Sequence, residues 1–92
     1  MKLSTLANAV GLAISEIGEA EVTGFAIDHR KVAPGTVFGA FPGARVNGED
    51  FIDAAIAAGA VAIVARPEAT VKGSVHFSDA EPRRAFAHLA KA

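Results

Sequence analysis

The sequence predicts an α/β fold, formed by one small domain in which a mixed sheet of about four to five short strands is packed with helices. Short apolar runs rich in Phe, Val and Ile recur at 24–28, 36–41 and 61–65, each bounded by turn residues, as is typical of strands. Between the second and third runs, apolar residues recur at helical spacing, which completes a strand, helix, strand unit. A chain of 92 residues has room for one hydrophobic core.

The composition indicates a folded, soluble chain and excludes several classes of function. A net charge of −1, with acids and bases interspersed, predicts neither a nucleic-acid partner nor a membrane partner. The absence of cysteine excludes disulfides and thiolate metal sites, and it is compatible with the cytoplasmic location that we expect. No apolar run approaches the roughly 20 residues of a membrane span, and the N-terminus does not resemble a signal peptide.

The N-terminal segment LSTLANAVGL, residues 3–12, predicts a short helix. Ser4 is available as its N-cap, and Leu3, Leu6 and Val10 recur along one face. The expected role of this helix is to cover the sheet.

The first two expected strands, 24–28 and 36–41, are separated by the sequence HRKVAPG. Pro34 presets φ near about −65° and Gly35 tolerates a positive φ, which is the pairing that a type II turn requires at its central positions. We therefore expect the chain to reverse at Pro34 and Gly35.

A polar loop at 42–48, PGARVNG, leads into the expected central helix. Asn47 or Gly48 can cap this helix, and Glu49 and Asp50 supply the negative charge that a first helical turn favours. The expected apolar face comprises Phe51, Ile52, Ala54, Ala55, Ile56 and Ala58.

Gly59 is expected to end the central helix, because glycine readily adopts the positive φ of a helix C-terminus. The continuous apolar run 61–65, VAIVA, then predicts a strand covered on both faces, which Pro67 stops. The segment 74–78, SVHFS, alternates enough to predict one more strand.

The C-terminal run from residue 79 predicts a second long helix. Asp79 can cap it, Pro82 falls within its first turn, and its apolar face comprises Phe86, Leu89 and Ala90. No stop signal precedes Ala92, so we expect the chain to be part of a longer protein.

No catalytic motif is found in the sequence. The GxxxxGK[ST] and GxGxxG phosphate loops are both absent. The three histidines, His29, His76 and His88, lack the spacing of a metal site and are expected at the surface or at strand ends. Asp28 and His29 are adjacent and should point to opposite sides of an extended backbone, which disfavours a nucleophilic triad. We therefore expect no catalytic residue and no metal site.

Two polar loops could bind a ligand. Asp28, His29 and Arg30 follow a strand, at the place where α/β sheets tend to bind ligands, and Arg30 could bind a phosphate. Alternatively, Asp28 caps the turn or pairs with Arg30 and holds the two glycine loops together. Arg45, in the loop before the central helix, could help to bind an anion or could be a solvated loop tip.

The order of these residues resembles the N-terminal domain of the Mur ligases, with the MurE type closest and the MurF type next. The resemblance is strong over about residues 22–66. It is carried by Asp28-His29-Arg30-Lys31-Val32, Pro34-Gly35, Phe38-Gly39-Ala40, Gly43, Asn47-Gly48, Asp50-Phe51-Ile52, Ala55 and Gly59-Ala60-Val61.

This resemblance implies that residues 1–92 are the first of three domains of an ATP-dependent amide ligase of peptidoglycan synthesis. That enzyme adds the third amino acid of the stem peptide to UDP-N-acetylmuramoyl-dipeptide, using ATP and magnesium. The first domain would bind the uridine diphosphate part of the substrate, would need no cofactor and would be inactive alone. Its partners would be the substrate and the remaining domains of the same enzyme.

By position, the resemblance implies that the uridine diphosphate contacts are made by Ile27, His29, Ala44, Arg45 and Val46. His29 stands where the family usually has serine, so a small hydroxyl donor is replaced by a bulkier imidazole. Asn47 stands where aspartate is usual, which keeps a capping side chain and removes a charge. Arg30 is expected to tie the loops rather than to contact the ligand.

Two other functions are consistent with the sequence. The chain could be the N-terminal domain of a MurF-type ligase, which adds D-alanyl-D-alanine. It could also be a non-catalytic module whose loop face docks a protein partner.

Overall fold

The computed structural model describes residues 2–3, 5, 21–43 and 47–91, so most of the helix predicted for 3–12 lies outside the described residues. In chain order, the elements are strand β1 (Gly24–Ala26), 3₁₀ helix η1 (His29–Lys31), strand β2 (Thr36–Gly39), 3₁₀ helix η2 (Gly48–Phe51), helix α2 (Ile52–Ala57), strand β3 (Ala62–Ala65), strand β4 (Val75–Ser78) and helix α3 (Pro82–Lys91). The predicted α/β class is confirmed.

The sheet has the order β1-β2-β3-β4, and each neighbouring pair of these strands is parallel. In the register, Val37 of β2 lies between Phe25 of β1 and Ala62 of β3. The prediction of a mixed sheet is therefore corrected to a parallel one for these strands; an isolated antiparallel bridge joins Lys2 to Glu21. The physical reason is that the connection between β1 and β2, which contains η1, brings the chain back to the edge of the sheet where β1 begins. β2 therefore runs in the same direction as β1.

The turn predicted at Pro34 and Gly35 is confirmed as the last reversal before β2. The amide of Thr36 donates to the carbonyl of Ala33 at 3.1 Å, and Gly35 has a φ of +92°. A Cβ at Gly35 would lie 2.9 Å from the carbonyl oxygen of Glu21, so a side chain there would be strained and crowded.

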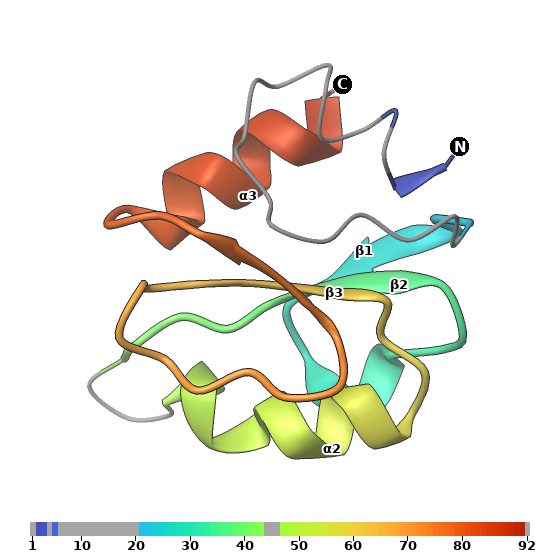
Figure 1. Cartoon of the computed structure of the whole chain (residues 1–92), viewed down its shortest axis with the longest axis horizontal. Coiled ribbons are helices and arrows are strands. Elements are labelled where there is room, and N and C mark those ends of the chain that lie inside the picture. The colour runs from blue at the N-terminus through green and yellow to red at the C-terminus, as the bar shows by residue number, and fades with distance from the viewer. Residues whose placement is uncertain (1, 4, 6–20, 44–46, 92) are drawn as a thin grey trace.

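Helices cover both faces of the sheet, with α3 on one side and α2 on the other (Figure 1). Alternate residues of the strands feed two separate cores, because side chains alternate across a strand. The core on the α3 side contains Leu3, Val37, Ala62, Val64, Phe77, Ala85 and Leu89. The core on the α2 side contains Phe38, Ala40, Ile52, Ala55, Ala60, Ile63 and Ala65. β3 contributes to both, so the prediction of a strand covered on both faces is confirmed.

The start and the end of the central helix agree with the prediction. The side chain of Asn47 accepts a hydrogen bond from the amide of Glu49 at 3.1 Å, and the first turn is the 3₁₀ helix η2. At the other end, Gly59 has a φ of +111° and its carbonyl accepts from the amide of Gly35 at 3.0 Å. The end of α2 therefore lies against the turn before β2.

The predicted apolar face of α2 was only partly right. Ile52 and Ala55 are buried, and Phe51 and Ile56 are half-buried, but Ala54 and Ala58 are exposed. At about 100° per residue, positions 54 and 58 fall away from the line through 52, 55 and 56.

The last strand and helix were predicted correctly in kind. The carboxylate of Asp79 accepts from the amide of Glu81 at 2.8 Å, and Pro82 begins α3. Leu89 is buried and Phe86 half-buried as expected, whereas Ala90 is exposed. None of the helices described is long and apolar enough to span a membrane.

Candidate functional site

The two loops predicted to bind a ligand leave the same edge of the sheet. Because β1 and β2 are parallel, the segments that follow Ala26 and Gly39 both start at the carboxyl edge. Ile27 follows β1 directly and is 61% exposed, which is unusual for a large apolar side chain among the described residues. His29 begins η1. The predicted contacts Ala44, Arg45 and Val46 lie outside the described residues.

The alternative in which Asp28 caps the turn and pairs with Arg30 is confirmed. The Asp28 carboxylate accepts from the Arg30 amide at 3.0 Å, from Nε at 3.1 Å and from Nη2 at 2.9 Å. These hydrogen bonds from Arg30 lower the pKa of Asp28 from 3.8 to about 2, and the same pairing raises the pKa of Arg30. Because the pair lies within one turn, it shapes the first loop and does not itself join the two loops.

His29 is linked to the central helix by a ring stack that the sequence did not predict. Its imidazole lies on the ring of Phe51, with 4.2 Å between centroids and 2° between planes. Both side chains are half-buried. The available signal was the placement of Phe51 at the start of an apolar helical face, but nothing local indicated its partner.

An ion pair that sequence reasoning also missed joins the start of the central helix to the end of β3. Glu49 accepts from Nε of Arg66 at 2.6 Å and from Nη2 at 2.8 Å. The Glu49 side chain is 13% exposed and that of Arg66 39%. The hydrogen bonds from Arg66 lower the pKa of Glu49, although partial burial opposes the shift.

Backbone hydrogen bonds close the second loop at its base. The amide of Gly48 donates to the carbonyl of Phe41 at 2.8 Å, and the amide of Ala40 donates to the carbonyl of Val64 at 2.9 Å. Pro42 and Gly43, at the start of the loop, are exposed. Phe41 and Gly48, the described residues that flank the second loop, are thus held together.

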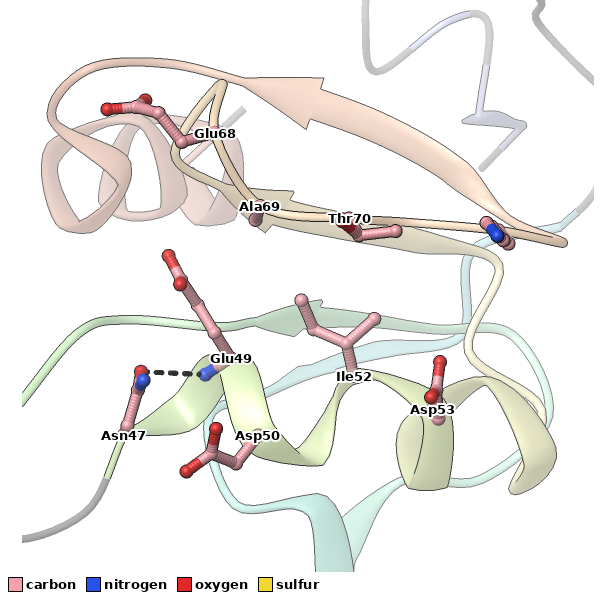
Figure 2. A pocket seen from close by; sticks show the side chains of 9 residues that line it. Asn47, Glu49, Asp50, Ile52, Asp53, Glu68, Ala69 and Thr70 are labelled. Atoms are coloured by element: carbon pink, nitrogen blue, oxygen red, sulfur yellow. Dashed lines mark hydrogen bonds between the residues drawn. The ribbon is translucent and has the colours of Figure 1, made fainter.

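A cleft of about 520 Å³ lies between the start of the central helix and the segment after β3 (Figure 2). It is lined by the carboxylates of Glu49, Asp50, Asp53 and Glu68 and by a single lysine, Lys72. The excess of negative charge disfavours a diphosphate ligand there. No group of three or more histidines and carboxylates within the described ranges is arranged to hold a metal ion.

His76 is placed differently from the expected surface or strand-end position. It lies within β4, paired in register with Ile63 of β3. Its Nε2 atom is buried and has no hydrogen-bond partner among residues 2–3, 5, 21–43 and 47–91. Because Ile63 belongs to the core on the α2 side and paired residues of neighbouring strands share a face, His76 faces the side of the sheet that α2 covers.

Comparison with known proteins identifies the family. The model of the Mur ligase family, catalytic domain, matches residues 21–91. The chain is 62% identical over 89 residues to the UDP-N-acetylmuramoyl-L-alanyl-D-glutamate--2,6-diaminopimelate ligase of Zymomonas mobilis, covering 97% of this chain and 18% of that protein. It is 42% identical over 87 residues to the ligase of the same name from Bradyrhizobium diazoefficiens, covering 95% and 18%. The chain therefore spans less than a fifth of the length of these relatives.

Solved structures agree in fold. A crystal structure of MurF from Acinetobacter baumannii superimposes with a TM-score of 0.78 at 21% identity, covering 95% of this chain and 19% of that one. A second crystal structure of that protein also gives a TM-score of 0.78, at 22% identity. The family match covers most of the chain, and the resemblance seen in the sequence is confirmed: the chain belongs to the Mur ligase family.

Proposed function

We propose that this chain binds the uridine diphosphate part of UDP-N-acetylmuramoyl-dipeptide, as the N-terminal domain of an ATP-dependent amide ligase that adds the third amino acid of the peptidoglycan stem peptide. The observation that carries the proposal is the 62% identity, over nearly the whole chain, to a ligase whose name specifies UDP-N-acetylmuramoyl-L-alanyl-D-glutamate. At 21% identity, the likeness to MurF supports the fold alone, so the MurE-type function is preferred.

The arrangement of the two loops is consistent with this proposal. Both begin at the carboxyl edge of a parallel sheet, where α/β folds bind ligands. Exposed Ile27 offers an apolar surface to a nucleoside, and His29 lies two residues further on. Because Asp28 engages the guanidinium of Arg30, Arg45 is our candidate for the cation that faces the diphosphate.

The remaining chemistry is assigned to the rest of the parent enzyme. We propose that two further domains bind ATP and magnesium and recognise the incoming amino acid, in the cytoplasm. This chain would need no cofactor and would not catalyse ligation alone. Its own role is to hold and orient the nucleotide end of the substrate, so that binding energy distant from the reacting carboxylate contributes to ligation.

The test is an amide NMR titration of the 92-residue chain with UDP-N-acetylmuramoyl-alanyl-glutamate, with UMP and ATP as controls. We expect shifts to cluster at residues 27–30 and 43–48 with the UDP ligand and not with ATP. A Kd weaker than about 100 μM, equivalent to only about 5 kcal/mol, would be consistent with a domain that normally shares its substrate with two others. No shift at millimolar ligand, or shifts confined to the acidic cleft, would contradict the proposal and favour the protein-interaction module.

A further inference from the structure

The His29 and Phe51 rings form a link between the two loops of the proposed site. Their planes differ by 2° and their centroids lie 4.2 Å apart, so one face of the imidazole is covered by the phenyl ring. His29 belongs to the segment after β1, and Phe51 ends η2, which follows the second loop. The stack therefore connects two segments that are separated in the sequence by β2.

The segment that carries His29 is held in shape by its own hydrogen bonds. The Asp28 carboxylate binds both the amide and the guanidinium of Arg30. The amide of Lys31 donates to the carbonyl of Asp28 at 2.9 Å. Ile27 immediately precedes this turn, so a constraint on His29 also restricts the position of Ile27.

The segment that carries Phe51 is also fixed. Asn47 caps η2 through the amide of Glu49, and the amide of Asp50 donates to the carbonyl of Asn47 at 3.0 Å. The Glu49 carboxylate is in turn held by Arg66 of the neighbouring segment. A constraint on η2 therefore also fixes Asn47, the first described residue after the second loop.

We propose that His29 is a positioning residue, which supports ligand binding through its ring stack on Phe51 rather than through a hydrogen bond from its imidazole. This inference rests on the proposed function. A serine at this position could donate a hydrogen bond but could not stack. In this chain, a flat ring that fixes the distance between the two loops would replace a hydroxyl group that contacts the ligand.

The test separates the ring from the donor with three variants of the 92-residue chain, His29→Phe, His29→Ser and Phe51→Leu, titrated with UDP-N-acetylmuramoyl-alanyl-glutamate. His29→Phe keeps a stack and removes the donor, so its Kd should stay within about twofold of the unsubstituted chain. His29→Ser and Phe51→Leu lose the stack, and their Kd should rise about two- to tenfold. A double variant that combines His29→Ser with Phe51→Leu should bind no more weakly than the weaker of these two single variants, because both substitutions remove the same contact.

A matched control distinguishes positioning from general stability. Leu89 is fully buried in the core on the α3 side of the sheet. Leu89→Ala should lower the denaturation midpoint but leave the Kd unchanged, because Phe51 packs against the other core, on the α2 side. The Kd of His29→Phe should stay near that of the unsubstituted chain even if its denaturation midpoint changes slightly.

The outcomes that contradict the inference can be distinguished from those that contradict the proposed function. If His29→Ser binds as well as the unsubstituted chain while His29→Phe loses affinity, His29 is a donor and the inference is overturned, although the proposed function stands. If the unsubstituted chain itself does not bind the UDP ligand, both fail. If Phe51→Leu does not fold, the two variants His29→Phe and His29→Ser decide the question alone. The His29 side chain is not part of either buried core, so both variants should fold.

Discussion

The turn after β1 is defined by a single carboxylate, that of Asp28. Its folded pKa of about 2 lies below the ordinary 3.8, so its contribution to stability is complete above pH 3.8 and is lost as the pH falls towards 2. Carboxyl-carbon NMR should show Asp28 titrating near the lower value. Arg30→Gln removes the hydrogen bonds from the guanidinium to Asp28, and the titration midpoint of Asp28 should therefore rise. A midpoint near 3.8 in the unsubstituted chain would mean that the pair does not form in solution.

The Glu49 and Arg66 pair is expected to matter more for folding, because the carboxylate is largely buried. Glu49→Gln should lower the free energy of unfolding by about 1–2 kcal/mol, since it removes a two-bond ion pair and leaves a partly buried guanidinium without its counter-charge. Urea denaturation measures this loss. Glu81→Gln is the matched control: its partner Arg84 is exposed, and the change should stay within about 0.5 kcal/mol.

Which of these contacts could be predicted depended on their separation in the sequence. Asp28 with Arg30 and Asn47 with Glu49 are two residues apart, and local turn and cap chemistry predicted both. Arg66 is 17 residues from Glu49, and the His29 stack crosses a whole strand. Such contacts depend on the sheet order, which local patterns do not determine.

The packing of α2 on the sheet gives a prediction for the whole helix. Ala55 is fully buried between α2 and the sheet, whereas Ala54 on the same helix is exposed. Ala55→Leu should overpack this layer and lower the free energy of unfolding by about 1–3 kcal/mol, while Ala54→Leu should change it by less than about 0.5 kcal/mol. Chemical denaturation of both variants tests this. Equal effects would show that the helix is rotated from the position described.

The type of each element, strand or helix, was easier to predict than the relative direction of the strands. The apolar runs and the signals at Asn47, Gly59 and Asp79 identified the elements and most of their ends. The turn at Pro34 and Gly35 is compatible with either strand direction. The parallel sheet follows from η1, whose tight turn is formed by three polar residues without a periodic pattern. The buried face of α2 was predicted only in part, because alanines lie on both its buried and its exposed side and are equally apolar on each.

For the molecule as a whole, the resemblance to Mur ligases supplied what local chemistry could not. Apolar periodicity predicts an α/β domain with 61–65 covered on both faces, and the structure agrees, although it has two cores, one on each face of the sheet, where one was expected. Nothing in the periodicity indicates a nucleotide. The proposed contacts at Ile27 and His29 lie on the described first loop, and those at 44–46 stay a prediction from the family pattern.

If the chain binds its ligand as a folded unit, ligand affinity and thermal stability must agree quantitatively. A ligand that binds only the folded chain stabilises it by RT ln(1 + [L]/Kd), which is about 0.4 kcal/mol when the ligand concentration equals Kd and about 1.4 kcal/mol at ten times Kd. For a domain of this size, these values correspond to increases in Tm of about 2–3 °C and about 5–10 °C. Calorimetry with UDP-N-acetylmuramoyl-alanyl-glutamate should give both increases, and ATP should give neither. An increase that is the same for UDP ligand and ATP would indicate non-specific anion binding, because only a site that recognises the uridine should distinguish the two nucleotides.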